Sequence, residues 1–287
     1  MKFVLLYSHS DEPITQVLLS SEFDQKFDTI KLSLETLLQD VTIIDEVNGI
    51  NTKVEWTLPS GIQISNTSGF YLINRVLSVP ETLVQDFVEE DKNYSLSELR
   101  AYLAFAIEAF PYCFSKPGAF GLSGNRFSLP RQWEMIKQAG LPLKVPSYYL
   151  GDMRFCQLKG EIVYSKPSNF YYWKPNPTIK NKVAFAFEKP RGIPVLACTT
   201  ETHTEVFPYE SHHAISLKDY ALIKEQVLIL SRLFNYSISE ALFFLDNQKV
   251  SFGMISNLPY ASRNKPWFSN MICSFFAQSI MEKDGKN

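Results

Sequence analysis

Three glycines at regular spacing, Gly118, Gly121 and Gly124, could do chemistry, because glycine-rich loops bring backbone N–H groups close to phosphates. Their spacing matches neither the GxGxxG pattern of dinucleotide-binding folds nor the GxxxxGK[ST] pattern of P-loops. A flexible loop ahead of a helix is therefore the favoured interpretation, and a ligand-binding loop is the weaker alternative.

The histidines form a second candidate, since His203, His212 and His213 lie close to Glu205 in the sequence. No HxH or HExxH spacing occurs, and adjacent residues on a strand point to opposite faces, so a surface loop is preferred over a metal site. The run Ser8-His9-Ser10 is a still weaker candidate for nucleophilic catalysis. A triad depends on side chains that meet in space, which neighbours in sequence do not ensure.

Composition argues against several classes of function. Lys and Arg number 28 against 30 Asp and Glu, with no basic run longer than a pair, so we expect no nucleic-acid partner. The four cysteines are widely separated and form no CxxC pair, which predicts reduced thiols and a cytoplasmic location. No stretch of about 18 uncharged apolar residues occurs, and the apolar run at the N-terminus is too short for a signal peptide, so we expect no membrane span.

Hydrophobic periodicity predicts the elements that would position these residues. Residues 3–7 indicate a buried strand, and residues 42–73 indicate short strands joined by turns. A helix is predicted from Ser95, where a capping-box spacing begins, to just before Pro111. A second helix over 126–139 and a small antiparallel sheet within 160–207 follow. The chain then ends in a helix over 216–234, a hairpin and a helix over 267–281.

Three segments, in order along the chain, resemble parts of ATP-grasp ligases. The passage from Gly124-Asn125-Arg126 to Val145-Pro146 resembles the helix that leads into their central domain, and AFAFEKPRGIPVLACTTETHTEVF is similar to their hinge strand. The segment KEQVLILSRLFNYSISEALFFLDNQKVSFGMISNLPYASR resembles their C-terminal helix and hairpin. YLINRVLSVPE is similar to an Arg-containing strand of the peptide-ligating, microviridin-type branch.

The resemblance implies an α/β and α+β fold. We expect an N-terminal α/β domain over residues 1–122, a linker helix and shortened central sheet domain over 123–208, and a C-terminal α+β domain over 209–287. It also implies an ATP-dependent carboxylate–amine ligase that acts on a peptide or small carboxylate through an acyl phosphate. The residues expected to contact nucleotide are Lys166 or Lys174 and Glu188, and those expected to orient the substrate carboxylate are Arg75, Arg126 or Arg263.

The metal site departs from the family pattern. There, a strand carboxylate and the Glu of a Glu-x-Asn-x-x-Pro motif hold Mg²⁺ against the ATP phosphates. Here the Glu position falls on Ile255, whereas Asn257 and Pro259 match, and the preceding strand has no carboxylate unless Glu240 or Asp246 has shifted. Asn257 and Asp246 are therefore the predicted metal-side residues of a degenerate site, and ATP and Mg²⁺ are doubtful cofactors.

The alternative is a non-catalytic relative that binds a peptide or an enzyme of the same pathway. Aromatic-rich stretches such as NFYYWKP and PYASRNKPWF favour a recognition surface, although Tyr171, Tyr172 and Trp173 are equally expected as buried sheet residues. A metal hydrolase or oxidoreductase has no motif to support it. An aromatic content of 14% and a net charge of -2 leave little repulsion between copies, so we expect a homodimer.

Overall fold

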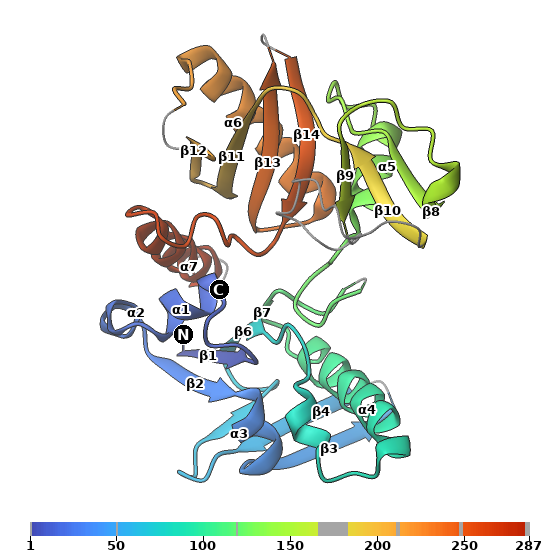
Figure 1. Cartoon of the computed structure of the whole chain (residues 1–287). Coiled ribbons are helices and arrows are strands. Elements are labelled where there is room, and N and C mark those ends of the chain that lie inside the picture. The colour runs from blue at the N-terminus through green and yellow to red at the C-terminus, as the bar shows by residue number, and fades with distance from the viewer. Residues whose placement is uncertain are drawn as a thin grey trace. The chain divides into compact units, whose positions relative to one another are not determined.

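The computed structural model describes residues 2–49, 51–118, 120–165, 183–210, 213–246 and 249–284 (Figure 1). Its packing divides the chain into two compact units. The first comprises residues 1–125 and 266–287, and the second comprises residues 126–265. Among the described residues, no helix is long and apolar enough to cross a membrane.

A parallel sheet of order β2-β1-β6-β7 forms the centre of the first unit. Its strands are β1 (Lys2–Tyr7), β2 (Thr29–Ser33), β6 (Phe70–Arg75) and β7 (Cys113–Phe114). The sequence KFVLLY of β1 is nearly all apolar because a central parallel strand is covered on both faces. The helices that belong to this part are α1 (Pro13–Leu19), α2 (Ser21–Lys26), α3 (Leu34–Gln39) and α7 (Phe268–Asp284), and Phe276 of α7 packs on Phe3 of β1.

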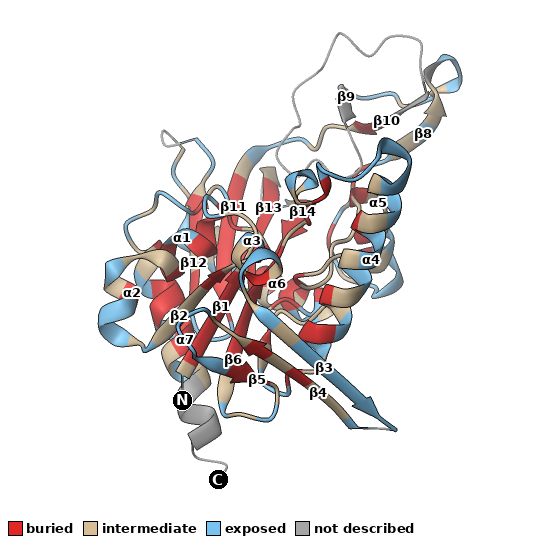
Figure 2. Cartoon of the chain, turned by 90° about the horizontal axis from the view of Figure 1, so that it is seen from below, coloured by how far each residue is buried: buried red, intermediate tan, exposed pale blue. Residues whose placement is uncertain are grey.

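A second sheet of the first unit is antiparallel, in the order β3-β4-β5. It consists of β3 (Thr42–Asn48), β4 (Asn51–Thr57) and β5 (Gln63–Ser65), and a 3₁₀ turn η1 (Glu81–Val84) and helix α4 (Glu89–Glu108) follow β6. Trp56 of β4 packs against Phe110 just after α4, with ring centroids 5.1 Å apart. Figure 2 shows β4 buried in its middle, whereas β3 is exposed along most of its length.

The second unit contains two antiparallel sheets. The smaller has the order β8-β10-β9, from β8 (Tyr148–Asp152), β9 (Ile162–Ser165) and β10 (Val183–Glu188), with a 3₁₀ turn η2 (Met153–Phe155). The larger has the order β12-β11-β13-β14, from β11 (Ile193–Thr200), β12 (Thr204–Pro208), β13 (Ile238–Asp246) and β14 (Lys249–Ser256). Helices α5 (Leu129–Gln138) and α6 (Leu217–Phe234) complete this unit.

The predicted class, α/β followed by α+β, is confirmed, and three details differ from expectation. Helix α4 begins at Glu89 and not at Ser95, which lies inside the helix. The sheet expected within residues 160–207 is split, because β11 pairs with β12 and β13, whereas β10 pairs with β8 and β9. The first unit takes in residues 266–287 as well as 1–125, so α7 packs with the N-terminal part of the chain and not with the segment from residue 209.

Candidate functional site

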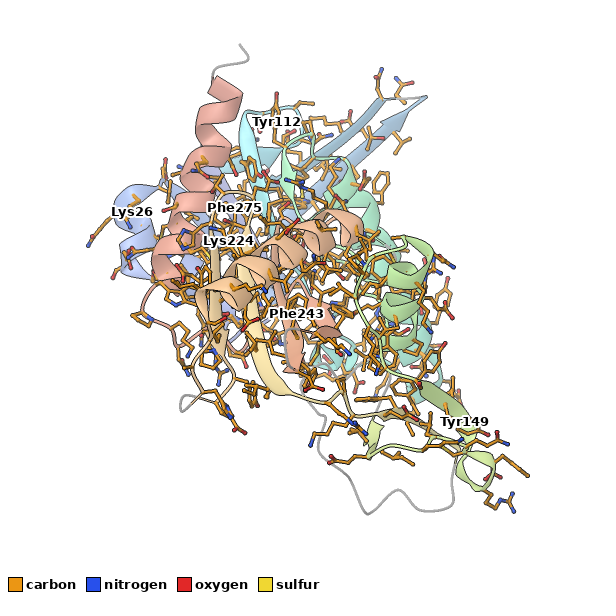
Figure 3. All side chains as sticks on the ribbon, turned by 90° about the horizontal axis from the view of Figure 1, so that it is seen from above. Lys26, Tyr112, Tyr149, Lys224, Phe243 and Phe275 are labelled. Atoms are coloured by element: carbon orange, nitrogen blue, oxygen red, sulfur yellow. The ribbon has the colours of Figure 1, made fainter. Side chains whose placement is uncertain are left out.

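The two faces of the larger sheet are covered differently. The Ser239 hydroxyl on β13 lies 2.7 Å from the Ser231 hydroxyl on α6, so Ser239 points toward that helix. Because side chains alternate along a strand, Ala241 and Phe243 also face α6, and Figure 3 shows Phe243 beside this helix. Side chains between them point to the opposite side, which we call the far face. Its members on β11, β13 and β14 include Cys198 of β11, Glu240 and Leu242 of β13, and Met254 and Ser256 of β14.

Glu240 is the carboxylate at the middle of the far face, and only 1% of it is exposed. It accepts hydrogen bonds from the Ala261 N–H, at 3.1 Å, and from the Ser262 hydroxyl. Burial, and then the charge of Glu240, raises the pKa of the neighbouring Cys198 thiol well above its ordinary value. Cys198 is therefore an inert buried thiol, and Glu240 holds the segment that follows β14.

That segment, residues 257–265, runs over the far face. Phe207 of β12 pairs with Leu196 of β11, whose side chain lies on the same face as Cys198. The Lys265 ammonium sits 4.6 Å from the centroid of the Phe207 ring, a cation–π contact. The contacts of Ser262 and Lys265 thus fix the segment at two points.

The hairpin register shows where Ile255, the position predicted for the missing Glu, lies. Ile255 pairs with Ala241, so its fully buried side chain faces α6 and belongs to the core there. A shift of one residue moves a side chain to the other face of a strand, and counting the Glu-x-Asn-x-x-Pro pattern back from Pro259 places its Glu at Met254 and its Asn at Ser256. On the far face Met254 lies directly opposite Leu242. Two apolar side chains therefore meet where the pattern expects a metal ligand.

The two predicted metal-side residues lie at opposite ends of this hairpin. Asp246 pairs with Lys249 beside the turn, whereas Asn257 follows the far end of β14, level with Glu240. Six residues separate Asp246 from Glu240, which is roughly 20 Å along an extended strand. One ion that contacted Asn257 could not contact Asp246. In the part of the chain that the structure describes, no cluster of three or more His, Cys, Asp or Glu side chains could hold a metal, so these residues do not fit a two-carboxylate Mg²⁺ site.

Of the predicted nucleotide contacts, Glu188 ends β10, at the connection between the two sheets of the second unit. Its carboxylate accepts a hydrogen bond of 2.9 Å from the Lys159 N–H, and its side chain is half-buried. The connection then turns at Gly192, whose φ of +105° is the left-handed region that favours glycine. Lys166 and Lys174 lie outside the described residues, as do Tyr171, Tyr172 and Trp173.

Arg75, one of the three predicted substrate-orienting arginines, forms a buried ion pair in the first unit. Its Nη2 lies 2.6 Å from Oε1 of Glu12 and its Nε lies 3.1 Å from Oε2, and 1% and 0% of the two residues are exposed. Glu12 also caps α1, because it accepts from the N–H groups of Ile14 and Thr15. Arg75 therefore holds a helix cap in place.

The other two arginines belong to the second unit. Arg126 is half-buried close to Tyr236, where its charge opposes the rise that burial causes in the pKa of the Tyr236 hydroxyl. Arg263 is exposed, on the segment that crosses the far face.

The weaker candidates have structural roles. His203 contacts Glu205 at 2.9 Å on the surface, and His212 lies outside the described residues. His9 contacts the Ser78 hydroxyl at 2.8 Å, and the Ser8 hydroxyl accepts from a backbone N–H after β6. The backbones of Gly118 and Gly121 pair in a tight turn.

Sequence reasoning missed two residues of α5 that hold β14. The Gln132 side-chain oxygen accepts from the Ile255 N–H at 2.8 Å, and the Trp133 indole donates to the Gly253 carbonyl at 2.8 Å. Their polar atoms satisfy the backbone of β14 along its outer edge, where the described residues add no further strand to the sheet. The amphipathic run RQWEMI was the available signal, but it shows only that one side of the helix is buried.

Comparison with solved structures places this architecture among known folds. The macrocyclase MdnC of Microcystis aeruginosa, bound with precursor peptide MdnA, matches with a TM-score of 0.67 over 97% of this chain and 100% of that one, at 13% identity. A RiPP-associated ATP-grasp ligase of Chryseobacterium gregarium, in complex with ADP and a leader and core peptide, matches with a TM-score of 0.68 over 96% and 95%, at 11% identity. The ATP-grasp ligase PsnB, complexed with minimal precursor, Mg and ADP, matches with 0.68 over 96% and 97%, at 13% identity.

The chain has the ATP-grasp fold. The resemblance seen in the sequence, including that to the peptide-modifying branch, is thus confirmed at the level of the fold. No family model matches the sequence, and no curated protein matches it either. The β13–β14 hairpin pairs from Glu240 with Ser256 to Asp246 with Lys249, with a register shift between Leu242 and Phe243.

Proposed function

We propose that this chain is an ATP-grasp-like protein of peptide or natural-product modification whose Mg–ATP site is degenerate, and that it acts as a peptide- or partner-binding subunit. The support for a peptide is the fold that it shares with ligases solved together with precursor peptides. The support for a lost ligase activity is the far face of the β13–β14 hairpin.

One observation carries this proposal: Leu242 lies opposite Met254 on the far face, and the motif counted back from Pro259 has its Glu at Met254. Phosphoryl transfer from ATP needs the charge on the β and γ phosphates neutralised, and Mg²⁺ is held there by oxygen ligands. Neither side chain offers such an atom, and the carboxylate of Glu240 is already occupied by Ala261 and Ser262.

Calorimetry with ATP, with and without Mg²⁺, tests the proposal directly. We expect no Mg²⁺-dependent binding and no Mg²⁺-dependent hydrolysis. Any weak nucleotide binding should depend on Lys166, Lys174 or Glu188 and change little when Mg²⁺ is removed. Robust Mg²⁺-dependent hydrolysis by the wild-type protein would contradict the proposal.

A rebuilt site gives a second test with a readout other than activity. The double variant Leu242→Asp/Met254→Glu places two carboxylates on directly opposed positions, where they repel each other unless a divalent cation lies between them. Its melting temperature should therefore rise when Mg²⁺ is added. Ile255→Glu is the matched control. Ile255 follows Met254 on β14, and its side chain faces α6 and not the far face. It should lower the melting temperature in both conditions and gain no response to Mg²⁺.

The competing function is an active carboxylate–amine ligase in which a displaced carboxylate holds the metal. One observation favours it, because Glu240 lies on the far face, opposite Ser256. In that case Glu240→Gln abolishes Mg²⁺-dependent hydrolysis, whereas Asp246→Asn, at the other end of the hairpin, has little effect. Arg126 and Arg263 would then orient the substrate carboxylate through paired hydrogen bonds. The expected homodimer accompanies either function, and light scattering would test it against the 32.9 kDa mass of one chain.

A further inference from the structure

The open edge of β3 has backbone groups that no described residue uses. Val54 of β4 bonds to Asn66 on the β5 side, through its N–H to the side-chain oxygen at 3.0 Å and through its carbonyl to the Asn66 N–H at 3.1 Å. Val54 therefore makes no ladder bonds to Asp45, its partner on β3. In an antiparallel pair such positions alternate, so the N–H and carbonyl groups of Ile43, Asp45 and Val47 point away from β4.

Of the features with which proteins usually protect an exposed strand, β3 has only the charges of Asp45 and Glu46. β3 has seven residues in unbroken register with β4, without a bulge, proline or lysine. The outer edge of β14 shows the contrast, because Lys144 bonds to the backbone of Val250 and Phe252 there. Figure 2 shows β3 exposed and projecting together with β4 from the rest of the first unit.

Side chains beside the edge are apolar and acidic. Val47 is 65% exposed, and Ile44 is 42% exposed on the other face of the strand. Phe105 of α4, 41% exposed, lies between Tyr102 and Ala109 on one side of its helix. Burial and then the charge of Asp45 raise the pKa of Tyr102 to about 12, which places that side chain near β3.

The occupant can be argued from charge. Asp45 and Glu46 are adjacent, so one carboxylate lies on each face of β3. Ala109, which follows the last residue of α4, lines a pocket together with Glu46. The end of α4 therefore lies close to Glu46 of β3. Like charges directly opposite in a sheet are unfavourable, and opposite charges are favourable. Lys53 of β4 already lies opposite Glu46, whereas Val54 lies opposite Asp45. A second copy of β3 would bring four carboxylates into one strand pair, whereas a strand with two adjacent basic residues would place a cation beside both Asp45 and Glu46.

We propose that the open edge of β3 is a docking site for an extended peptide segment of a partner, which adds a strand to the sheet and sets two adjacent Lys or Arg residues opposite Asp45 and Glu46. Apolar β-branched residues on either side of the basic pair would lie beside Ile44 and Val47. Main-chain hydrogen bonds provide affinity in this mode of recognition, and the side-chain pattern provides specificity. The site is independent of the hairpin of the second unit and needs no nucleotide.

The test uses the full-length chain and a synthetic peptide of alternating Val and Thr with two central Lys residues. Amide hydrogen exchange, resolved by residue, should show fast exchange at Ile43, Asp45 and Val47 in the free protein and protection when the peptide is added. A peptide with two Glu residues in place of the lysines should neither bind nor protect. Asp45→Asn/Glu46→Gln should weaken binding of the lysine peptide by about threefold to twentyfold, from the usual range for cross-strand charge pairs.

Proline substitutions separate docking from folding. Val47→Pro removes an N–H that points to the open edge, so it should abolish binding with little change in melting temperature. Glu46→Pro removes an N–H of the β3–β4 ladder and should lower the melting temperature instead. The proposal fails if the two peptides bind equally, if the protected amides lie elsewhere, or if Ile43, Asp45 and Val47 are already protected in a free protein that light scattering shows to be a dimer.

Discussion

The buried pair of Glu12 and Arg75 gives the sharpest prediction for the first unit. Arg75→Met keeps most of the side-chain volume but leaves Glu12 buried without its partner. Removing one member of a buried ion pair costs about 3–5 kcal/mol, because the remaining charge is uncompensated. For a protein of this size that corresponds to a melting temperature lower by roughly 6–20 °C.

The pH dependence of this loss of stability tests whether the uncompensated charge of Glu12 is its cause. Burial by itself would raise the pKa of Glu12, but the charge and hydrogen bonds of Arg75, with those of Thr15, lower it overall. A lowered pKa means stability that is present above the unfolded pKa and is lost as pH falls through the folded value. In Arg75→Met burial dominates and the pKa of Glu12 rises. As pH falls, protonation of Glu12 removes the uncompensated buried charge, and the variant regains stability. The difference between the two proteins should therefore be largest near neutral pH and should shrink toward pH 4.

Urea unfolding at several pH values, followed by far-UV circular dichroism, measures this difference. Lys26→Met is the matched control, because the Lys26–Glu22 pair lies on the exposed side of α2 and its loss should not be measurable (Figure 3). A loss below about 1 kcal/mol for Arg75→Met, or one independent of pH, would refute the reasoning. If Arg75→Met instead lost peptide binding while its stability stayed unchanged, the result would support the substrate-orienting role that the sequence resemblance implies for Arg75.

Three further substitutions test how the elements are held. Gly192→Ala should lower the free energy of unfolding by more than about 3 kcal/mol, because φ is +105° and a Cβ would meet the Leu245 carbonyl. Gly69→Ala is its control, and it should be nearly neutral in the same urea titration because the space around Gly69 is open. Val88→Ser should stabilise the protein by about 1 kcal/mol in thermal unfolding, since α4 begins without a side-chain cap. Gln132→Leu should cost about 1–3 kcal/mol by leaving the N–H of β14 that it binds buried and unpaired, and faster exchange of that amide would verify the cause.

Much of the fold could be predicted where a local signal coincides with the tertiary structure. Helix α6 begins after Ser216, whose hydroxyl accepts from the Asp219 N–H, and ends at Phe234 as expected. The start of α4 was missed because its N-cap is Val88, which has no side-chain acceptor. The capping-box spacing at Ser95 lies within the helix, where Ser97 bonds back to a carbonyl one turn earlier. A capping pattern thus shows that a helix is near, and contacts with the rest of the protein decide how far it extends.

The far face illustrates why the site itself was only partly readable from the sequence. Met254 and Ile255 are both apolar, and the two local anchors disagree, because Asn257 places the Glu of the motif at Ile255 whereas Pro259 places it at Met254. Two facts distant in sequence decide the register: the pairing of β14 with β13, and the hydrogen bond that turns Ser239 toward α6. Together they place Ile255 in the core that faces α6, and Leu242 opposite Met254 on the far face. In the degenerate site that we propose, both of these positions are apolar. Restoring one carboxylate alone should therefore not create a cation site, because a lone carboxylate among apolar side chains takes up a proton.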